Sequence, residues 1–389
     1  MQAEKHLALG VDLGGTKIYT LLADARGAVV AEEKRPVPPG RELPAVLDEV
    51  LQSIAGVLRQ AGESLRRHYN LGQGNLRQEK LREAAAAADA AGDTGPSFAG
   101  RPSWLSALSP GAGNCLAAIK EYRRQLESAG MTIAGLGLGI AAVVSSDGRT
   151  VRQAPNLGWK EVPLADWLEA ALEMKVYMDN DTNVAALGEY CFGGAAGTDF
   201  LVYIGVGTGI GGGIIAGGKL FRGSSGGAAE IGHIAVEPQG PCCSLGHPGC
   251  LEAMASGTAI GRMAREEVRK GRGARLLELA GGDVSRVTAQ VVGEALQEGD
   301  PAALEVVRRA GSYLGMGVAT VINVLNPAVV VIGGGAANLG EPLFAAVEEE
   351  VKLRAFPALR EAVRIVPSRL RERVGGLGAA ALVFTSGRG

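Results

Sequence analysis

Two short glycine-rich turns, each flanked by apolar runs, constrain the fold of this chain most strongly. The first turn, DLGGTK at residues 12–17, joins apolar residues 7–13 to residues 18–23. The second turn, GVGTG at residues 205–209, joins residues 200–206 to residues 212–216. Apolar runs of this length joined by a tight turn are typical of β-hairpins. Because the arrangement occurs twice, we predict an internal duplication of two α/β halves that each present such a turn.

The rest of the chain alternates between helical and strand patterns, as in other α/β proteins. Apolar residues at helical spacing predict helices at residues 45–60, 114–129, 182–192, 258–270, 287–297, 301–325, 342–353 and 376–385. Short apolar runs predict strands at residues 133–144, 176–179, 328–332 and 364–367. Residues 63–113 differ, because they combine an arginine-rich stretch, an alanine run and a Gly/Pro/Ser segment. We predict an insertion there that is partly helical and partly disordered.

Length and composition allow two domains and argue against several classes of protein. A chain of 389 residues is long enough for two cores, and its net charge of −2 gives no general attraction to nucleic acid or to an anionic membrane. Residues 201–218 are uncharged, but eight of them are glycine, which favours turns over a membrane helix. The N-terminus indicates a first strand and not a signal peptide. Three of the five cysteines crowd between Cys242 and Cys250, which predicts reduced thiols or a metal in a cytoplasmic protein.

Both turns have the residues that bind phosphate. Glycines let backbone N–H groups approach phosphate oxygens, Thr16 adds a hydroxyl donor, and Asp12 can hold Mg²⁺, usually through water. An ordinary hairpin turn is the competing interpretation of the first turn. The second turn contains a formal G-x-G-x-x-G at 207, 209 and 212, but a dinucleotide fold needs a helix directly after it. Since a strand pattern follows, we reject that interpretation.

Two further segments concentrate polar side chains. DNDTN at residues 179–183 lies at a predicted strand end; helix capping needs one such residue, and a carboxylate in that place can also act as a general base. Residues 226–252 hold Glu230, His233 and Glu252, which can bind adjacent hydroxyl groups of a polyol through charge-assisted hydrogen bonds. The Cys and His residues of the same stretch resemble a metal site. Either set could instead be structural.

Together these segments resemble the ROK family of repressors and sugar kinases, and within it the glucokinases. The resemblance covers nearly the whole chain outside residues 63–113. It rests on DLGGTK at 12–17, PNLGW at 155–159, NDTNVAALGE at 180–189, GVGTGIGGGI at 205–214, EIGH at 230–233 and GCLE at 249–252. At Ala141-Ala142 the family usually has Pro-Gly, a difference that we expect to affect a turn.

The resemblance implies an actin/hexokinase-like ATPase fold, with two α/β domains around a nucleotide cleft. The implied N-terminal domain contains residues 1–152 and 375–389, with the insertion at 63–113, and the C-terminal domain contains residues 153–374 with the sugar-binding and Cys/His loop. By the same resemblance, Asp181 is the catalytic base. The implied sugar contacts are Asn156, Asn180, Glu230, His233 and Glu252. The implied residues for ATP and Mg²⁺ are Asp12, Gly14, Gly15, Thr16, Lys17, Thr208, Gly209, Gly333, Gly334 and Gly335.

The zinc signature of the family, C-x-C-G-x-x-G-C after the EIGH histidine, is incomplete in this chain. Leu245 stands in place of the middle cysteine, so His233, Cys243 and Cys250 remain. Structural Zn²⁺ with four ligands needs one more, and Cys242 and His247 are the nearby substitutes. We include Cys242 in the predicted set and keep His247 as the alternative; a loop that holds its sugar-binding residues without zinc also stays open.

These observations predict ATP-dependent phosphorylation of a hexose, most simply glucose to glucose 6-phosphate. The resemblance implies a homodimer in the cytoplasm that uses ATP, Mg²⁺ and a structural Zn²⁺, with no nucleic-acid or membrane partner. Kinases for mannose, fructose or an N-acetylhexosamine share the signature residues and remain open. A sugar-responsive transcription repressor is less favoured, because such proteins carry a winged-helix domain before the first phosphate motif, which here begins at residue 12.

Overall fold

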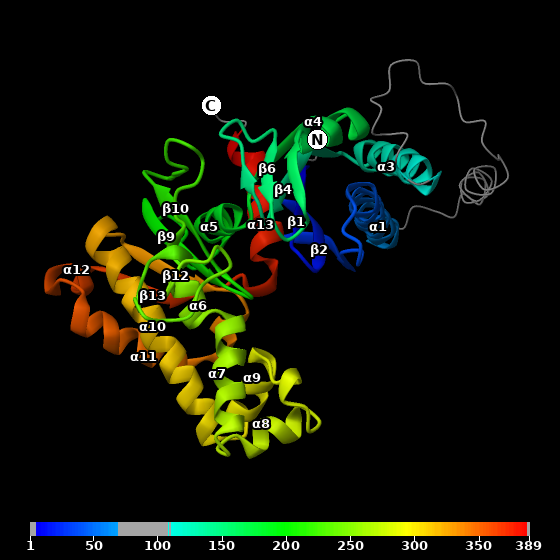
Figure 1. Cartoon of the computed structure of the whole chain (residues 1–389). Helices are drawn as coiled ribbons and strands as arrows, with labels where there is room; N and C mark the ends of the chain where they lie inside the picture. The colour runs from blue at the N-terminus through cyan, green and yellow to red at the C-terminus, as the bar shows by residue number, and fades with distance from the viewer. Residues whose placement is uncertain (1–4, 69–107, 109, 387–389) are drawn as a thin grey trace. The chain divides into compact units, whose positions relative to one another are not determined.

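The computed structural model describes residues 5–68, 108 and 110–386, and the chain forms two compact units (Figure 1). Unit 1 contains the chain up to Val184 and from Gly375 onward, and unit 2 contains residues 185–374. The predicted domain boundary at residue 152 lies inside unit 1. The reason is that β8 (Val176–Asn180), which follows that residue, pairs in parallel with β4 (Met131–Ile140) of the same sheet.

Unit 1 is built on a five-stranded sheet in the order β3-β2-β1-β4-β8. Strands β1 (Lys5–Leu13), β2 (Lys17–Asp24) and β3 (Val29–Pro36) are antiparallel neighbours, whereas β4 and β8 run parallel to β1. A small second sheet contains β5 (Val143–Val144), β6 (Val151–Ala154) and β7 (Trp159–Val162). The helices are α1 (Leu43–His68), α3 (Pro110–Ser128), α4 (Leu164–Leu172), the first turn of α5 (Asp181–Phe192) and nearly all of α13 (Val374–Ser386).

The sequence GLGLGI in β4 gives the sheet of unit 1 two different faces, because successive side chains point to opposite sides of a strand. Leu136 and Leu138 are buried in a core that also contains apolar residues of α1. Gly137, which lies between them, faces α13, and a methyl group added there would lie 1.7 Å from the carbonyl oxygen of Ala379. Helix α13 can therefore lie directly on the strand backbone. Its own small residues (GGLGAAA) also permit this close contact.

Unit 2 repeats this sheet topology with the order β11-β10-β9-β12-β13. Strands β9 (Phe200–Val206) and β10 (Ile210–Ala216) form an antiparallel hairpin extended by β11 (Lys219–Leu220), and β12 (Val329–Gly333) and β13 (Arg364–Pro367) follow in parallel. Each sheet thus begins with a hairpin and adds two parallel strands beside its first strand. This shared topology agrees with the predicted duplication.

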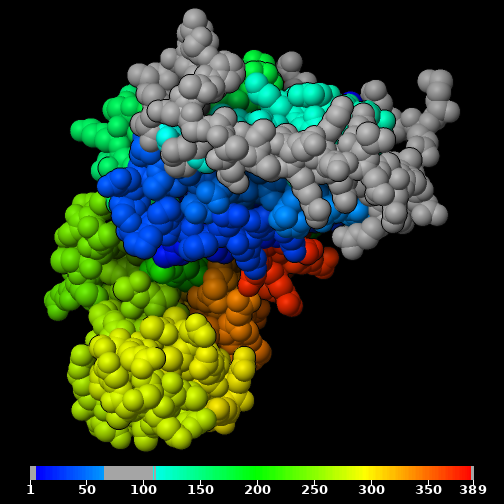
Figure 2. Space-filling view, turned by 90° about the vertical axis from the view of Figure 1, so that its right-hand side faces the viewer, coloured from blue at the N-terminus to red at the C-terminus, as the bar shows by residue number. Residues whose placement is uncertain are grey.

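Unit 2 also contains helices and short 3₁₀ turns. They are η2 (Ile231–His233), α6 (Leu251–Ala255), α7 (Gly257–Arg269), α8 (Ala274–Leu279), η3 (Val284–Arg286), α9 (Ala289–Gln297), α10 (Pro301–Leu325), η4 (Gly335–Leu339), α11 (Glu341–Arg354), α12 (Pro357–Ala362) and η5 (Arg371–Arg373). Helices α8 and α9 gather with the start of α10 in a helical layer, seen as the yellow surface in Figure 2. Helix α10 begins with an Asp300 cap and Pro301, a common helix start, and approaches α11 closely at Gly311 and Gly315.

Several sequence expectations need adjustment. The predicted strand at 133–144 ends at Ile140, and Ala141-Ala142 form a bend before β5. Helix α1 continues to His68, whereas residues 69–107 of the predicted insertion lie outside the described residues. The uncharged residues 201–218 form the β9–β10 hairpin, and over the described chain no helix has the length and apolar character to span a membrane.

Candidate functional site

In unit 1 the parallel strands bring two of the predicted segments to one edge of the sheet. Asp12 lies opposite Gly139, which in turn lies opposite Asp179, so β1, β4 and β8 end side by side. The carboxyl ends of parallel strands are where α/β folds bind ligands. The first turn after β1 and the DNDTN segment after β8 therefore meet, although 162 to 171 residues separate them in the chain.

Asp12 and Asp181 are close enough to influence each other electrostatically. Burial and, to a smaller extent, the negative charge of Asp181 raise the pKa of Asp12 to about 6, and the nearby Lys17 opposes both effects. Gly375 closes this side of the site, since a methyl group there would lie 2.4 Å from Asp12 Oδ2. Two carboxylates in a partly buried place favour a cation between or beside them, and hard oxygen ligands suit Mg²⁺. The residues present thus fit the predicted magnesium role of Asp12.

The first turn is a tight hairpin connection. The backbone N–H of Gly14 donates to the carbonyl of Lys17 at 3.0 Å, and Leu13 pairs with Ile18. Thr16 and Lys17 are exposed at its tip, and Gly14 and Gly15 are partly exposed. This turn leaves side-chain donors and glycine backbone accessible, as binding to phosphate oxygens requires.

The polar side chains of DNDTN have different partners in the structure. Asn180 Oδ1 caps α5, accepting from Thr182 N at 2.9 Å and Asn183 N at 3.3 Å, while its Nδ2 donates to the Ala142 carbonyl at 3.1 Å. Asp179 is buried and accepts from Asn183 Nδ2 at 2.8 Å. Asp181, the first residue of α5, accepts from Thr182 N at 2.9 Å and lies near Asp12. Among these carboxylates, Asp181 is the candidate for chemistry, and Asn180 already has a structural role as a cap.

Asn156, the predicted sugar contact of the PNLGW segment, lies against the first turn. A methyl group added at Gly15 would be 3.2 Å from Asn156 Cβ. Arg41 holds this loop in place: its Nη1 donates to the Asn156 carbonyl at 2.5 Å, and its own carbonyl accepts from Trp159 Nε1 at 3.2 Å. Sequence reasoning missed Arg41, since no motif links residue 41 to residues 156–159.

The second turn, in unit 2, packs against the start of α7. Gly207 N donates to the Gly209 carbonyl at 2.9 Å, and the Gly207 and Thr208 carbonyls accept from Gly257 N at 2.8 Å and Thr258 Oγ1 at 2.7 Å. Strand β10 follows directly, which is consistent with the rejection of a dinucleotide motif, because such a motif would continue as a helix.

The predicted adenosine segment, Gly333 to Gly335, lies beside the base of the second turn. Gly333 pairs with Gly205 across β12 and β9, and a methyl group at Gly334 would lie 2.4 Å from the carbonyl oxygen of Val206. Gly334 also has a φ of 81°, which favours glycine. The residues predicted to bind phosphate and those predicted to lie near the adenosine are therefore close together at one end of strands β9 and β12 in unit 2.

The EIGH segment forms the short turn η2 against β10. Gly232 permits this contact, because a methyl group there would lie 2.1 Å from the Ile210 carbonyl oxygen. Glu230 is exposed, and its Oε2 lies 3.9 Å from His233 Nε2. Leu251 N donates to the Ile234 carbonyl at 2.8 Å and joins EIGH to GCLE. Glu230, His233 and the segment of Glu252 thus occupy one region of unit 2, whereas Asn156, Asn180 and Asp181 belong to unit 1.

Glu252 has structural partners on both carboxylate oxygens. Oε2 accepts from Ile210 N at 3.1 Å, and Oε1 accepts from Ser244 Oγ at 3.0 Å. Its side chain therefore connects the second turn to the Cys/His loop, a role that the sequence did not indicate. A carboxylate has about four lone-pair sites, so these two bonds leave capacity for a sugar hydroxyl.

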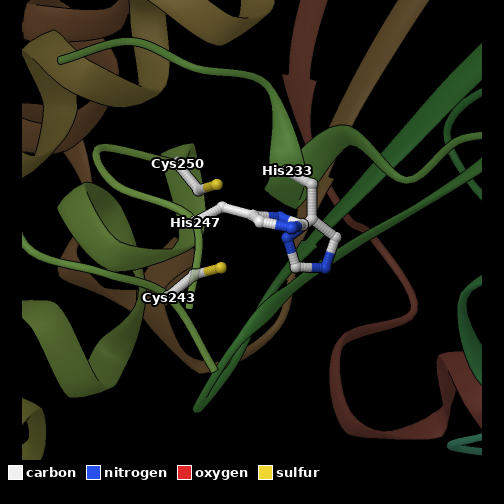
Figure 3. Close-up of side chains that lie close together, drawn as sticks. All are labelled: His233, Cys243, His247 and Cys250. Carbon is white, nitrogen blue, oxygen red and sulfur yellow. The ribbon is translucent and has the colours of Figure 1, made fainter. Parts of the chain in front are cut away.

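Three of the four predicted metal ligands come together, and the fourth differs. The potential ligand atoms of His233, Cys243, His247 and Cys250 all lie within 4.8 Å of one another (Figure 3). Cys242 is exposed and is not part of this group, whereas the alternative residue, His247, belongs to it.

A buried glutamate was also missed. Glu189, in the second half of α5, is fully buried and accepts hydrogen bonds from Ser368 Oγ at 2.5 Å, Leu370 N at 3.2 Å and Gly194 N at 3.0 Å. These contacts connect α5 to the segment after β13. Helical spacing alone could not distinguish this carboxylate from an exposed one, because two of its donors, Ser368 and Leu370, lie 179 and 181 residues away in the chain.

Comparison with known proteins identifies the family to which this chain belongs. The ROK family model matches residues 113–386. The chain is 39% identical to a glucokinase of Thermotoga maritima over 249 residues, 64% of this chain and 78% of the relative. It is 35% identical to a xylose repressor of Caldicellulosiruptor bescii over 253 residues, 65% of this chain and 63% of the repressor.

A solved structure extends the similarity to nearly the full length. A ROK family glucokinase from Streptomyces griseus, in complex with glucose and AMPPNP, matches with a TM-score of 0.72 and 29% identity, over 97% of this chain and 98% of that chain. This match supports the predicted actin/hexokinase-like fold class of two α/β units. The family match and the shared fold place this protein in the ROK family.

Proposed function

We propose that this protein phosphorylates glucose with ATP and Mg²⁺ and that Asp181 is the general base. At the level of reaction class, it is an ATP-dependent sugar kinase of the ROK family, as the glucokinase relatives and the AMPPNP-bound neighbour indicate. The choice of glucose, the role of Asp181 and the use of Mg²⁺ are our proposal.

One observation carries the proposal: the edge of the unit-1 sheet gathers a phosphate-type turn, two mutually repelling carboxylates and a sugar-type contact. Asp12 and Asp181 influence each other's charge, and Asn156 lies against Gly15 of the turn. Phosphoryl transfer depends mainly on positioning and charge neutralisation, so it needs this kind of arrangement more than a strong nucleophile.

Each residue would have a distinct task. Asp181 would orient the 6-hydroxyl group of the sugar and accept its proton as the oxygen bonds to the γ-phosphorus of ATP, which releases ADP. When bound, Mg²⁺ would neutralise phosphate charge, and Asp12 would hold it through water. Thr16, Lys17, Thr208 and Gly209 would donate to phosphate oxygens, and Gly333 to Gly335 would lie beside the adenosine. Asn156, Asn180, Glu230, His233 and Glu252 would contact the sugar.

We also propose that the Cys/His group holds a structural Zn²⁺ that keeps the loop of residues 233–252 in shape. Two thiol and two imidazole groups are typical ligands of structural zinc. A cytoplasmic homodimer remains the expectation from the family resemblance.

A coupled assay of ADP release across glucose, mannose, fructose and N-acetylglucosamine tests the proposal. We expect release only with ATP, Mg²⁺ and sugar together, and the largest kcat/KM with glucose. A larger kcat/KM with another hexose would replace glucose and keep the kinase. ADP release that no sugar stimulates would contradict both the choice of glucose and the sugar kinase activity.

A repressor function is the second candidate, because the chain is 35% identical to a xylose repressor. It predicts tight binding to a specific DNA duplex that weakens steeply with salt. Titration of the full chain with duplex DNA at two salt concentrations, with and without sugar, separates this function from the kinase.

A further inference from the structure

We infer that His247 is the fourth ligand of the metal site, so that this chain binds one Zn²⁺ through two cysteines and two histidines: Cys243, Cys250, His233 and His247. This inference does not depend on the proposed kinase activity, because metal binding is measured without sugar or nucleotide.

The geometry of the four side chains fits tetrahedral zinc. With bonds of about 2.3 Å to sulfur and about 2.0 Å to nitrogen, tetrahedral ligand atoms lie roughly 3.3–3.8 Å apart. The corresponding atoms here are all within 4.8 Å of one another, so small side-chain rotations bring them to bonding positions. Figure 3 shows the two thiols and the two rings converging on one point. The ring planes of His233 and His247 lie at 83°, so each ring can direct a nitrogen to a different corner of a tetrahedron.

An unsatisfied polar atom provides a second, independent indication. The Nδ1 atom of His233 is buried and has no hydrogen-bond partner among the described residues, while Nε2 of the same ring faces Glu230 at 3.9 Å. A buried polar atom without a partner costs about 1–3 kcal/mol. A metal ion among the four side chains would satisfy this nitrogen, and Cys250, which is buried, belongs to the same group.

The backbone of the loop explains why His247 replaces a cysteine. Cys243 N donates to the His247 carbonyl at 2.8 Å, and Gly246 N donates to the Cys243 carbonyl at 2.9 Å, so residues 243–247 form a closed turn. Gly246 has a φ of 84°, which this turn requires of a glycine. The turn places His247 beside Cys243, and it leaves Leu245 at the apex with 60% of its surface exposed. Leu245 stands where the family signature has a cysteine, and the histidine two residues later lies in the group.

Cys242 does not fit this arrangement. Its backbone forms an antiparallel β-bridge with Pro248 across the loop, and the residue is exposed. Its neighbour Cys243 belongs to the ligand group. The two sets also differ in charge: two thiolates make the Zn²⁺ centre neutral, and a third thiolate from Cys242 would make it negative. The number of thiolates is therefore the property that an experiment should measure.

The test compares two single variants of the full-length protein, kept reduced and loaded with zinc: His247→Ala and Cys242→Ser. The readouts are zinc content by elemental analysis and zinc affinity by competition with a chelator. We expect about one zinc per chain in the wild type and in Cys242→Ser. In His247→Ala we expect affinity to fall by at least roughly 10–100-fold, since even loss of an outer-shell partner can cost that much. His6→Ala, which removes an exposed histidine outside the group, is the matched control.

Cobalt substitution then counts the thiolates. Co²⁺ in the wild type should give a tetrahedral spectrum whose sulfur charge-transfer intensity corresponds to two thiolates, unchanged in Cys242→Ser. Loss of zinc in Cys242→Ser with retention in His247→Ala would overturn the inference and assign Cys242. Less than about a tenth of an equivalent of zinc in reduced, folded wild type would overturn the site itself.

Discussion

The carboxylate of Glu252 accepts a hydrogen bond from the backbone N–H of Ile210 at 3.1 Å, and it thereby joins the GCLE segment to the end of the second glycine-rich turn. The contact is close enough to exclude a side chain at Gly209. A methyl group there would lie 2.4 Å from Glu252 Oε2. The same carboxylate holds Ser244 of the Cys/His loop, so a disturbance at Gly209 should reach that loop.

The first prediction follows from this contact. Gly209→Ala should lower the free energy of unfolding by about 1–3 kcal/mol, because the added methyl group displaces the Glu252 carboxylate. Urea unfolding measures the change. Gly207→Ala is the matched control, since a methyl group there meets no atom of the described chain within 4 Å. Equal destabilisation by both variants would mean that the contact with Glu252 is not the cause.

The second prediction concerns Asp181. Asp181→Asn keeps the size of the side chain but removes the proton acceptor, so kcat should fall by roughly 10²–10⁴-fold with a small change in KM for the sugar. Steady-state ADP release measures both constants. Asp199→Asn, which neutralises an exposed carboxylate of unit 2, should keep wild-type kinetics. Full activity of Asp181→Asn would remove this residue as the base.

The third prediction uses the raised pKa of Asp12. Because burial and Asp181 raise this pKa from 3.8 to about 6, the folded protein binds more protons than the unfolded chain between about pH 4 and pH 6. The contribution of Asp12 to the free energy of unfolding therefore falls as the pH rises through this window and stays reduced above it. Asp12→Asn should remove this cost and stabilise the protein by about 1–2 kcal/mol at pH 7.5.

Urea unfolding in EDTA at pH 7.5 and pH 4 checks this sign, since EDTA excludes stabilisation by Mg²⁺. The gain should shrink to about 0.5 kcal/mol at pH 4, where Asp12 is almost fully protonated in the folded state and nearly half protonated in the unfolded chain. The same variant should lose Mg²⁺-dependent activity. A variant that is less stable than wild type at pH 7.5 would show that Asp12 makes a favourable structural contact that outweighs its burial.

The fourth prediction concerns the buried Glu189. Its carboxylate accepts from Ser368 Oγ, Leu370 N and Gly194 N, so Glu189→Ala should lower the free energy of unfolding by about 3–5 kcal/mol. Ser368→Ala removes only one donor and should cost about 1–3 kcal/mol. Combining both substitutions in a double-mutant cycle should give a cost below the sum of the two. Strict additivity would contradict a direct interaction between the two side chains.

Much of the fold was predictable from local sequence patterns. The apolar runs on either side of DLGGTK and GVGTG specify two hairpins, and the structure places them at equivalent positions of two sheets with the same strand order. Helices such as α10 carry their own start and stop residues, Asp300 with Pro301 and Asn326. The six-residue helices α8 and α12 were not predicted, because helices of this length are too short to show a periodic pattern.

The candidate site was predicted less completely, because a motif shows which residue types occur and not which of their atoms are already bonded. DNDTN contains several polar side chains, and the sequence does not distinguish which of them caps the helix and which is placed for chemistry. Only the tertiary contacts show that Asn180 caps α5 while Asp181 lies beside Asp12. Glu252 was predicted as a sugar contact, but the sequence did not show that Ile210 and Ser244 also hold it.

The sequence by itself determined the two glycine-rich hairpins, their duplication and the residue types at each predicted segment, since turn chemistry and hydrophobic periodicity act over a few neighbouring residues. The tertiary structure alone decided that His247 and not Cys242 joins Cys243, that Arg41 holds the Asn156 loop, and that Glu189 is buried. These outcomes depend on which side of the backbone a side chain faces and on contacts between residues far apart in the chain. Neither is set by the residues next to it in the sequence.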